Sequence, residues 1–452
     1  MKNTYWTTLL LGMTAFLNIA CEDETGTPDD SNLTTEEWIV NFLYTEYLWN
    51  GEAKEKTPDY SSPENLFYSL LSLKDGKTGA DGTHYYYSYI EKKNATKAID
   101  TESTYGFEFV LYNIVDDSGS LGYYYARVLY VLPGSPAEKA GLKRGAWITA
   151  INGQEITSQN YESLLNGNGI SIETHSSNFN LPGTTLTLPA SIAMDENPLL
   201  LDTILHANGQ SIGYLVYNHF KTGIGDDADD HTYDDQMADA FRRFKESNVT
   251  EFVLDLRYNG GGYLSSAQQL GSYLVPEENK TDIFCYLEDN RQNKDSYPFI
   301  NRGYNLGLSR VFILVSDQTA SASEAIINGL RPYTEVVLIG NTTEGKNVAS
   351  IHEEHGEWAM QPIVSRVYNC NEESGYENGF TPEASLLCDE LDPNENSTLF
   401  PLGDQREYML AKALGIIQGR TPSALSTKSH GKGTLPAYNS LARKQSNAVL
   451  LH

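Results

Sequence analysis

A serine within a run of small residues is the strongest candidate nucleophile in this chain. Ser321 lies in the run SDQTASASEA, residues 316–325, directly after the apolar residues 311–315. A buried strand that turns tightly into a helix can expose a serine hydroxyl and direct the following backbone N–H groups at a developing oxyanion. Taken alone, the same residues also fit a helix cap, because Ser321 and Glu324 have the spacing of a capping box.

Two further groups supply the other parts of an acyl-transfer site. Lys346 ends the run GNTTEGK, which follows the apolar residues 336–339. A lysine that is removed from water has a lowered pKa and can act as a general base. Three glycines, residues 260–262, follow the apolar residues 252–256 and let backbone N–H groups approach a ligand closely. The alternative for Lys346 is a solvated surface residue, and the alternative for the three glycines is a flexible turn.

These residues require strands and helices that alternate along the chain. Apolar runs predict strands, and a 3.6-residue apolar period predicts helices. The expected strands are residues 213–220, 252–257, 311–315 and 336–339, and the expected helices are residues 233–247 and 323–330. This alternation predicts α/β layers over residues 211–418.

A second unit is expected over residues 104–190. Apolar residues alternate with other residues over 128–132, as they do in a strand. Residues 136–142 have Pro at the start and Gly near the end, which is typical of a short helix. Residues 147–153 predict a strand and an Asn-Gly turn. The run GSPAEKAGL, residues 134–142, resembles a PDZ domain. Such domains bind peptides by adding a strand to a sheet edge. The resemblance implies that the loop at Gly106 and Phe107 holds a peptide carboxylate, although Glu108 is an awkward neighbour for that group; the alternative is a spacer with a degenerate groove.

The combination of motifs resembles the C-terminal processing, or tail-specific, proteases of serine peptidase family S41. The matching segments are DLRYNGGG at 255–262, SASE at 321–324, Gly340, GK at 345–346, GFTPE at 379–383 and LGD at 402–404. The resemblance implies that Ser321 is the nucleophile and Lys346 the base of a Ser–Lys dyad. It also implies that the N–H groups of Ala322 and Gly261 form the oxyanion hole. No metal or cofactor is implied.

The implied architecture is multidomain, with α+β and α/β parts. It comprises an N-terminal helical unit (34–100), a PDZ-like β-rich domain (104–190) and a ClpP/crotonase-like α/β protease core (211–418). In family members of this kind the PDZ domain covers or uncovers the active site, so we expect residues 104–190 to border the cleft with Ser321. A domain that moves should be held by modest, polar contacts.

Three departures from the family pattern concern the lysine. Ser350 stands where Gln is common, Asn347 where Gly is common, and Glu344 lies two residues before Lys346, where a carboxylate would raise the lysine pKa. The departures at Ser350 and Glu344 motivate an alternative function, a non-catalytic PDZ-containing lipoprotein that binds peptides as a scaffold or sensor.

The N-terminus has the features of a bacterial lipoprotein signal. A basic Lys2, a short apolar run from 9 to 20 and then Cys21 predict a signal peptide over residues 1–20 and a lipid on Cys21. Asn18 departs from the usual small or apolar residue, and an ordinary signal peptide is the alternative. Residues 21–33 are polar and predict a tether. The expected location is the cell envelope, with the lipid in the outer membrane on its periplasmic or surface face.

The charge restricts the partners. The chain has 452 residues, with 32 Lys and Arg against 60 Asp and Glu and a net charge of −28. This surface repels phosphate backbones, so nucleic acid is not an expected partner; a peptide or unfolded protein is. The sequence indicates no oligomeric state. In an exported chain Cys370 and Cys388 are candidates for a disulfide.

Two segments have less specific patterns. Apolar stripes predict helices over residues 34–75. The tyrosine-rich residues 81–89 predict a strand with aromatic packing, and a sugar-stacking platform formed by the tyrosines at 85–89 is the alternative. Residues 419–452 are polar and basic without periodicity, and we expect a mobile tail with no assigned role.

Overall fold

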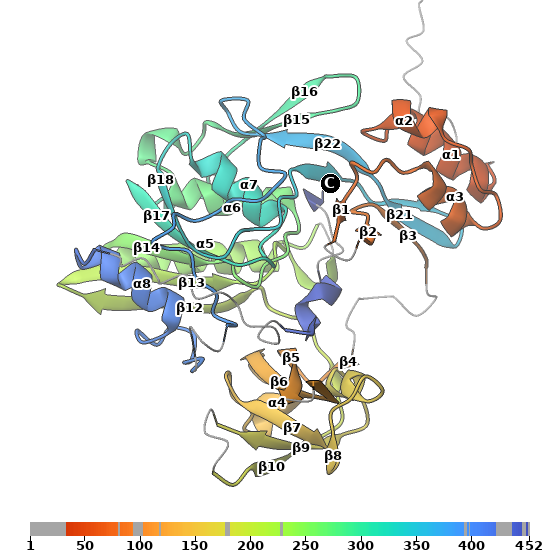
Figure 1. Cartoon of the computed structure of the whole chain (residues 1–452). Helices are drawn as coiled ribbons and strands as arrows, with labels where there is room; N and C mark the ends of the chain where they lie inside the picture. Colours follow the sequence, from red (N-terminus) through yellow and green to blue (C-terminus); the bar gives the residue numbers. More distant parts are fainter. Residues whose placement is uncertain are drawn as a thin grey trace, which may run out of the picture.

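The computed structural model describes residues 33–79, 82–93, 103–116, 119–176, 181–226, 229–392, 396, 398–421, 436–444 and 449–450. They form three units. The β-rich unit lies below the α/β core in Figure 1, and the N-terminal helices lie beside the core. The predicted signal peptide, most of the tether and Cys21 fall outside the described residues, among which no helix is both long and apolar enough to cross a membrane.

The core is built on a sheet in which four strands run parallel. Its order is β12 (Leu199–Ala207), β13 (Gln210–Tyr217), β14 (Val249–Asp255), β17 (Arg310–Val315) and β18 (Glu335–Gly340), with β12 antiparallel to β13. One face packs on α5 (Thr232–Glu246), α6 (Leu264–Leu274) and α7 (Ala322–Leu330), and the other on α8 (Tyr408–Ile417). Successive residues of β14 point to opposite faces of the sheet. Leu254 packs in the cluster with α5, α6 and α7, and Val253 packs in the cluster with α8.

Further strands join the N-terminal unit to the core. One sheet comprises β16 (Lys294–Pro298), β15 (Ile283–Glu288), β22 (Ile363–Tyr368), β19 (Val348–Ser350) and β24 (Val449–Leu450), and another comprises β20 (Glu353–His355), β21 (Trp358–Gln361) and β3 (Tyr89–Lys92). The N-terminal unit contains α1 (Thr35–Thr45), α2 (Asn50–Glu55), α3 (Pro63–Leu70), β1 (Lys77–Thr78) and β2 (His84–Tyr85). Because β3 pairs with β21, this unit is partly stranded and shares its hydrophobic cluster with the core.

The β-rich unit is the expected PDZ-like domain. Its main sheet has the order β10 (Thr184–Leu188), β9 (Ile170–His175), β7 (Trp147–Ile151), β6 (Gly119–Val131), β5 (Phe107–Asp116) and β23 (Tyr438–Asn439), and β8 (Gln154–Glu155) pairs with β7. Short helices α4 (Pro136–Lys139) and η2 (Tyr161–Leu164) accompany it, and β4 (Ser103–Thr104) pairs with β11 (Ile192–Ala193). The predicted strands and the short helix after residue 135 are confirmed.

One expectation is wrong in the described residues. The C-terminal region is not left as a free tail: β23 extends the PDZ sheet, residues 440–444 form the short helix η5, and β24 pairs with β19. Backbone pairing needs no apolar period, which is why the sequence pattern did not show it. Cys370 and Cys388, the candidates for a disulfide, are not joined by one.

Candidate active site

The predicted site residues follow the carboxyl ends of three neighbouring parallel strands. Residues 260–262 follow β14, Ser321 follows β17 and Lys346 follows β18. Carboxyl ends of parallel strands meet at one edge of a sheet, so this topology gathers residues that lie far apart in the sequence.

Ser321 is the N-cap residue of α7, but its backbone conformation and its buried side chain are unusual for a cap. Its φ of 61° is one that residues with a side chain rarely adopt, at a cost of roughly 1–3 kcal/mol. The side chain is buried, yet its Oγ has no hydrogen-bond partner among the described residues. The capping-box spacing is therefore used only in part: the Glu324 carboxylate accepts from the Ser321 N–H at 3.0 Å, and the serine hydroxyl stays unbound.

The glycine turn lies directly against Ser321. A Cβ added to Gly261, whose φ is +116°, would lie 2.7 Å from the Ser321 Cβ and 3.0 Å from its Oγ, so only glycine permits this approach. Asn259 ties the turn to the serine loop, because its carbonyl accepts from the Ala320 N–H at 3.2 Å and from the Ser323 hydroxyl at 3.0 Å.

The two expected oxyanion donors differ in their present state. Ala322 is the first residue of α7, so its N–H has no acceptor within the helix. The Gly261 N–H donates to the Asn259 side-chain oxygen at 2.9 Å. An oxyanion could therefore accept from the Ala322 N–H directly. It could accept from the Gly261 N–H only after that group releases the Asn259 side-chain oxygen.

Lys346 lies in an environment that favours the neutral amine. It is 3% exposed, and its Nζ lies 4.6 Å from the centre of the Tyr87 ring. Burial lowers the pKa of Lys346 to about 8, although the nearby carboxylates of Asp75, Glu344 and Glu324 raise it.

Glu324 joins the two halves of the site, a role that the sequence analysis missed. One carboxylate oxygen accepts from the Ser321 N–H at 3.0 Å and the Lys346 N–H at 2.7 Å, so both backbones are held by a single atom. The other oxygen accepts from the Thr343 hydroxyl and the Gly345 N–H, each at 2.6 Å. Burial raises the pKa of Glu324 to about 7, opposed by these hydrogen bonds. The capping-box spacing was the available signal.

Glu344 is engaged by groups other than the lysine amine. Its carboxylate accepts from the hydroxyls of Tyr85 at 2.7 Å and Tyr87 at 3.1 Å, and lies 3.6 Å from the Lys77 ammonium. Tyr87 thus contacts both Glu344 and Lys346. The tyrosine-rich segment of the N-terminal unit therefore forms a wall of the site, which neither interpretation of these tyrosines anticipated.

Ser350, which stands where Gln is common, is hydrogen-bonded to a glutamine of another strand. Ser350, in β19, accepts a hydrogen bond from the Gln361 side chain at 2.9 Å, and Gln361 accepts one from Tyr89 at 2.5 Å. Asn347 donates to the Ser374 carbonyl at 2.6 Å.

The expected carboxylate loop of the PDZ-like domain is already occupied. The Gly106 N–H donates to the Thr104 hydroxyl at 2.9 Å, and Phe107 is buried in the domain core. Glu108 is 5% exposed and accepts from the Ser440 hydroxyl. A peptide carboxylate at this place remains a prediction.

The junction between the PDZ-like domain and the core contains polar contacts, and its charged groups are buried. Arg144 donates to Glu390 at 2.8 Å and also to Tyr258, three residues before Gly261. Glu390 is paired in turn with the fully buried Arg257, and although burial alone would raise its pKa, Arg257 and Arg144 lower it to about 2. The Tyr130 and Tyr258 rings, 5.3 Å apart, continue this contact. The domain therefore does border the loop that carries the glycine turn.

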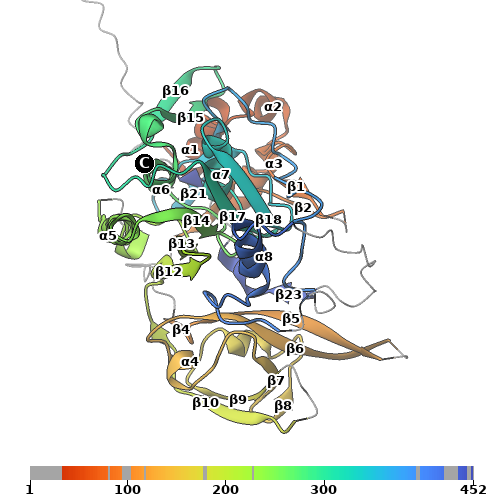
Figure 2. The same cartoon turned by 90° about the vertical axis from the view of Figure 1, so that its left-hand side faces the viewer.

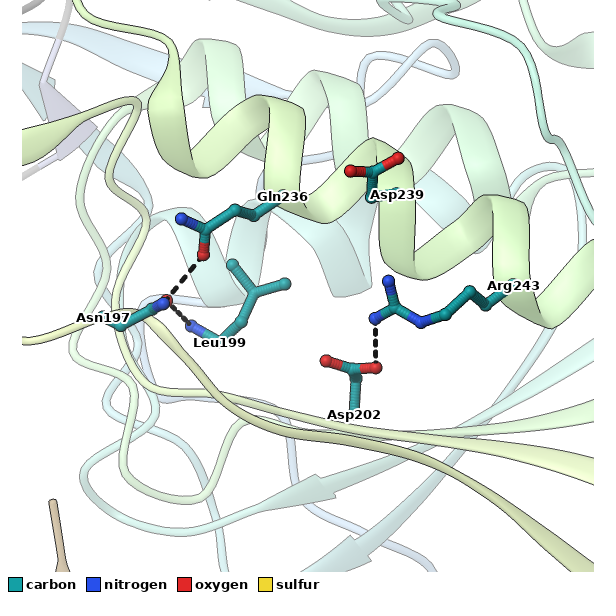
Figure 3. Close-up of a pocket in the computed structure, with 6 residues that line it drawn as sticks. All are labelled: Asn197, Leu199, Asp202, Gln236, Asp239 and Arg243. Carbon is teal, nitrogen blue, oxygen red and sulfur yellow. Dashed lines mark hydrogen bonds and ion pairs between the residues drawn. The ribbon is translucent and has the colours of Figure 1, made fainter. Parts of the chain in front are cut away.

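A separate cavity of about 250 Å³ lies between β12 and α5 (Figure 3). Asn197 faces Gln236, and Arg243 faces Asp202 with a 2.5 Å contact. Its lining holds neither Ser321 nor Lys346, and we assign it no chemistry.

A buried serine, a buried lysine and backbone donors at one edge of a parallel sheet are groups that serine hydrolases use. Comparison with known proteins agrees. The model of peptidase family S41 matches residues 211–386, that of the S41 N-terminal domain residues 34–89, and that of the PDZ domain residues 127–167. A crystal structure of an S41 protease from Bacteroides fragilis NCTC 9343 is 33% identical with a TM-score of 0.73, over 84% of this chain and 97% of that one. The chain belongs to peptidase family S41, and the predicted family and multidomain fold are confirmed.

Curated relatives are more distant. The carboxy-terminal processing protease CtpB of Bacillus subtilis is 26% identical over 58% of this chain and 51% of its own length. The carboxyl-terminal-processing protease of Picosynechococcus is 24% identical over 64% and 66%. The chain thus spans about half to two thirds of the length of these relatives.

Proposed function

We propose that the protein is a serine endopeptidase that cleaves peptides or the C-terminal regions of proteins through an acyl-enzyme on Ser321, with Lys346 as general base. The observation that carries the proposal is the Ser321 hydroxyl, which lies on a strained backbone and is buried without a hydrogen-bond partner in the part of the chain that the structure describes. A structural serine would be expected to use its hydroxyl as a cap, at a gain of about 1 kcal/mol.

The chemical steps follow from the groups present. As Ser321 Oγ attacks the scissile carbonyl carbon, its proton passes to the neutral Lys346 Nζ. The carbonyl oxygen becomes an oxyanion that accepts from the N–H groups of Ala322 and Gly261. When the C–N bond breaks, the Lys346 ammonium returns the proton to the leaving amine. Water then attacks the ester by the same route and releases Ser321.

The environment of the lysine makes this step feasible near neutral pH. With a pKa of about 8, roughly one tenth of the Lys346 side chains are neutral at pH 7, against fewer than about one in a thousand for an ordinary lysine.

Cleavage assays test the proposal. We expect Ser321→Ala and Lys346→Ala each to lower kcat by about 10⁴-fold or more on an unstructured peptide, with unchanged thermal unfolding. Ser309→Ala, which changes a serine before β17, is the matched control. Near-normal turnover by Lys346→Ala would exclude the dyad. If wild type and Ser321→Ala bind peptide alike and neither cleaves it, the peptide-binding alternative replaces the protease.

We further propose that Cys21 carries a lipid and anchors the enzyme in the cell envelope, at the outer membrane. The sequence around residues 9–24 supports this. Incorporation of labelled palmitate that is lost in Cys21→Ser is the expected result. Unchanged membrane association of Cys21→Ser would contradict it.

A further inference from the structure

The C-terminal segment of the chain lies on the free edge of the PDZ sheet. Tyr438 and Asn439, which form β23, pair antiparallel with Leu111 and Val110 of β5. The Ala437 N–H donates to the Leu111 carbonyl at 2.7 Å, and the Phe109 N–H donates to the Ser440 hydroxyl at 2.8 Å. Figure 2 shows β23 directly against β5, on the side that faces the core.

This edge is the one that a peptide ligand of the domain would use. The segment runs toward the loop at Gly106, as a strand added to β5 in this orientation must. The Tyr438 ring lies between the two walls of the groove, with its centre 6.1 Å from that of Phe109 in β5 and 4.9 Å from that of Tyr161 in η2. A side chain of this chain therefore fills the groove.

The polar groups of the edge match an internal segment better than a chain end. The buried Glu108 carboxylate accepts from the Ser440 hydroxyl, whereas it would repel a terminal carboxylate. The segment then continues into η5 (Ser440–Lys444). The edge thus fits an extended internal peptide with an aromatic residue two positions before a hydroxyl.

The same segment contacts the protease core at two places. Leu441 is 2% exposed and belongs to a hydrophobic cluster that joins Val110 and Leu129 of the PDZ-like domain to Tyr258 of the core. Further on, β24 pairs parallel with β19, which begins two residues after Lys346.

We propose that the C-terminal segment is an intramolecular ligand of the PDZ edge, and that it competes with peptide substrates for this edge. The competition with substrates rests on the proposed function; the occupancy of the edge does not. A tethered ligand acts at an effective concentration in the millimolar range, so a substrate must displace it before it can use the edge.

Binding of a fluorescein-labelled peptide of residues 436–444 to the full chain, measured by fluorescence polarisation, tests whether the C-terminal segment occupies the PDZ edge. Tyr438→Asp should release the tethered segment, so we expect this variant to bind the peptide at least about tenfold more tightly than wild type. Ala442→Asp changes an exposed neighbouring position and should bind like wild type. A chain that ends at residue 435 should bind like Tyr438→Asp. Equal, weak binding by wild type, Tyr438→Asp and the shortened chain would overturn the proposal.

Cleavage of an unlabelled long peptide by the same variants supplies the second measurement. Release of the segment should raise kcat/KM by about tenfold, through a lower KM. If no variant cleaves any peptide while the binding pattern holds, the proposed protease function fails and the intramolecular ligand stands. If cleavage is normal and Tyr438→Asp changes neither binding nor KM, the intramolecular ligand fails and the protease stands.

Discussion

The substitution Glu324→Gln tests how the active site is assembled. The carboxylate accepts four hydrogen bonds, two at each oxygen, from Ser321, Lys346, Thr343 and Gly345. Glutamine has nearly the same shape but keeps only one acceptor oxygen; its amide group is a donor. With the amide group at the oxygen that Ser321 and Lys346 share, two buried N–H groups lose their acceptor. With the amide group at the other oxygen, only the Gly345 N–H loses its acceptor, because the Thr343 hydroxyl can rotate and accept from the amide.

The magnitude follows from the number of donors left without an acceptor. A buried donor without an acceptor costs about 1–3 kcal/mol, so the substitution should lower the free energy of unfolding by about 1–3 kcal/mol in the better orientation of the amide and by about twice that in the other. Because Ser321 and Lys346 are held by the same oxygen, their relative position should also relax. A displacement of about 1 Å costs about 100-fold in rate, so we expect kcat/KM to fall by that factor or more.

The assay combines chemical denaturation with a pH profile of kcat/KM. Glu324 is one of the groups that raise the pKa of Lys346, so its neutral replacement should move the midpoint of the residual activity to lower pH. A purely structural role would leave that midpoint unchanged. Glu335→Gln, at an exposed position of β18, is the matched control and should change stability by less than about 0.5 kcal/mol. A Glu324→Gln enzyme with wild-type stability and turnover would refute the reasoning.

Three further outcomes are expected at the site. For wild type, kcat/KM should rise with pH around a midpoint near 8, as Lys346 loses its proton; a midpoint near that of an ordinary lysine would contradict the burial argument. Tyr87→Ala should admit water to the amine and shift this midpoint upward, whereas Tyr87→Phe should not, and equal profiles would exclude the ring as the barrier. Gly261→Ala should lower kcat by about 100-fold or more because the added Cβ meets Ser321, whereas Gly51→Ala, where nothing lies within 4 Å, should leave it unchanged.

The parts of the site that the sequence predicted are those next to apolar strands. Residues 260–262, Ser321 and Lys346 each follow a strand of the core, and the strands were visible as apolar runs. The order of the strands was not, because it depends on which edges pair and not on the composition of each run. Their convergence at one sheet edge therefore required the structure.

The parts that the sequence did not predict depend on contacts between distant segments. Tyr87 has the pattern of an ordinary strand residue, and its contact with Lys346 exists only because the N-terminal unit packs on the core. Tyr438 lies in a polar tail, where pairing through the backbone leaves no apolar period. Glu324 was visible as a helix cap, but its bonds to the loop at 343–346 were not.

Arg144 is the residue through which the PDZ-like domain should affect turnover. It donates to Glu390, Tyr258 and the Leu129 and Phe400 carbonyls, so Arg144→Met keeps much of the volume and removes these bonds. A long peptide that contacts both the PDZ edge and the dyad needs the two domains in a fixed relation, whereas a short one needs only the dyad.

We therefore expect Arg144→Met to lower kcat/KM at least about tenfold for a peptide of about twelve residues and less than about twofold for one of about four. Lys143→Met, at the exposed adjacent position, should affect neither. Equal losses on both peptides would show that Arg144 acts on the glycine turn through Tyr258 rather than on the placement of the domain. In that case the long-peptide advantage would have to arise within the core itself, since the domain would no longer be needed to direct the peptide to Ser321.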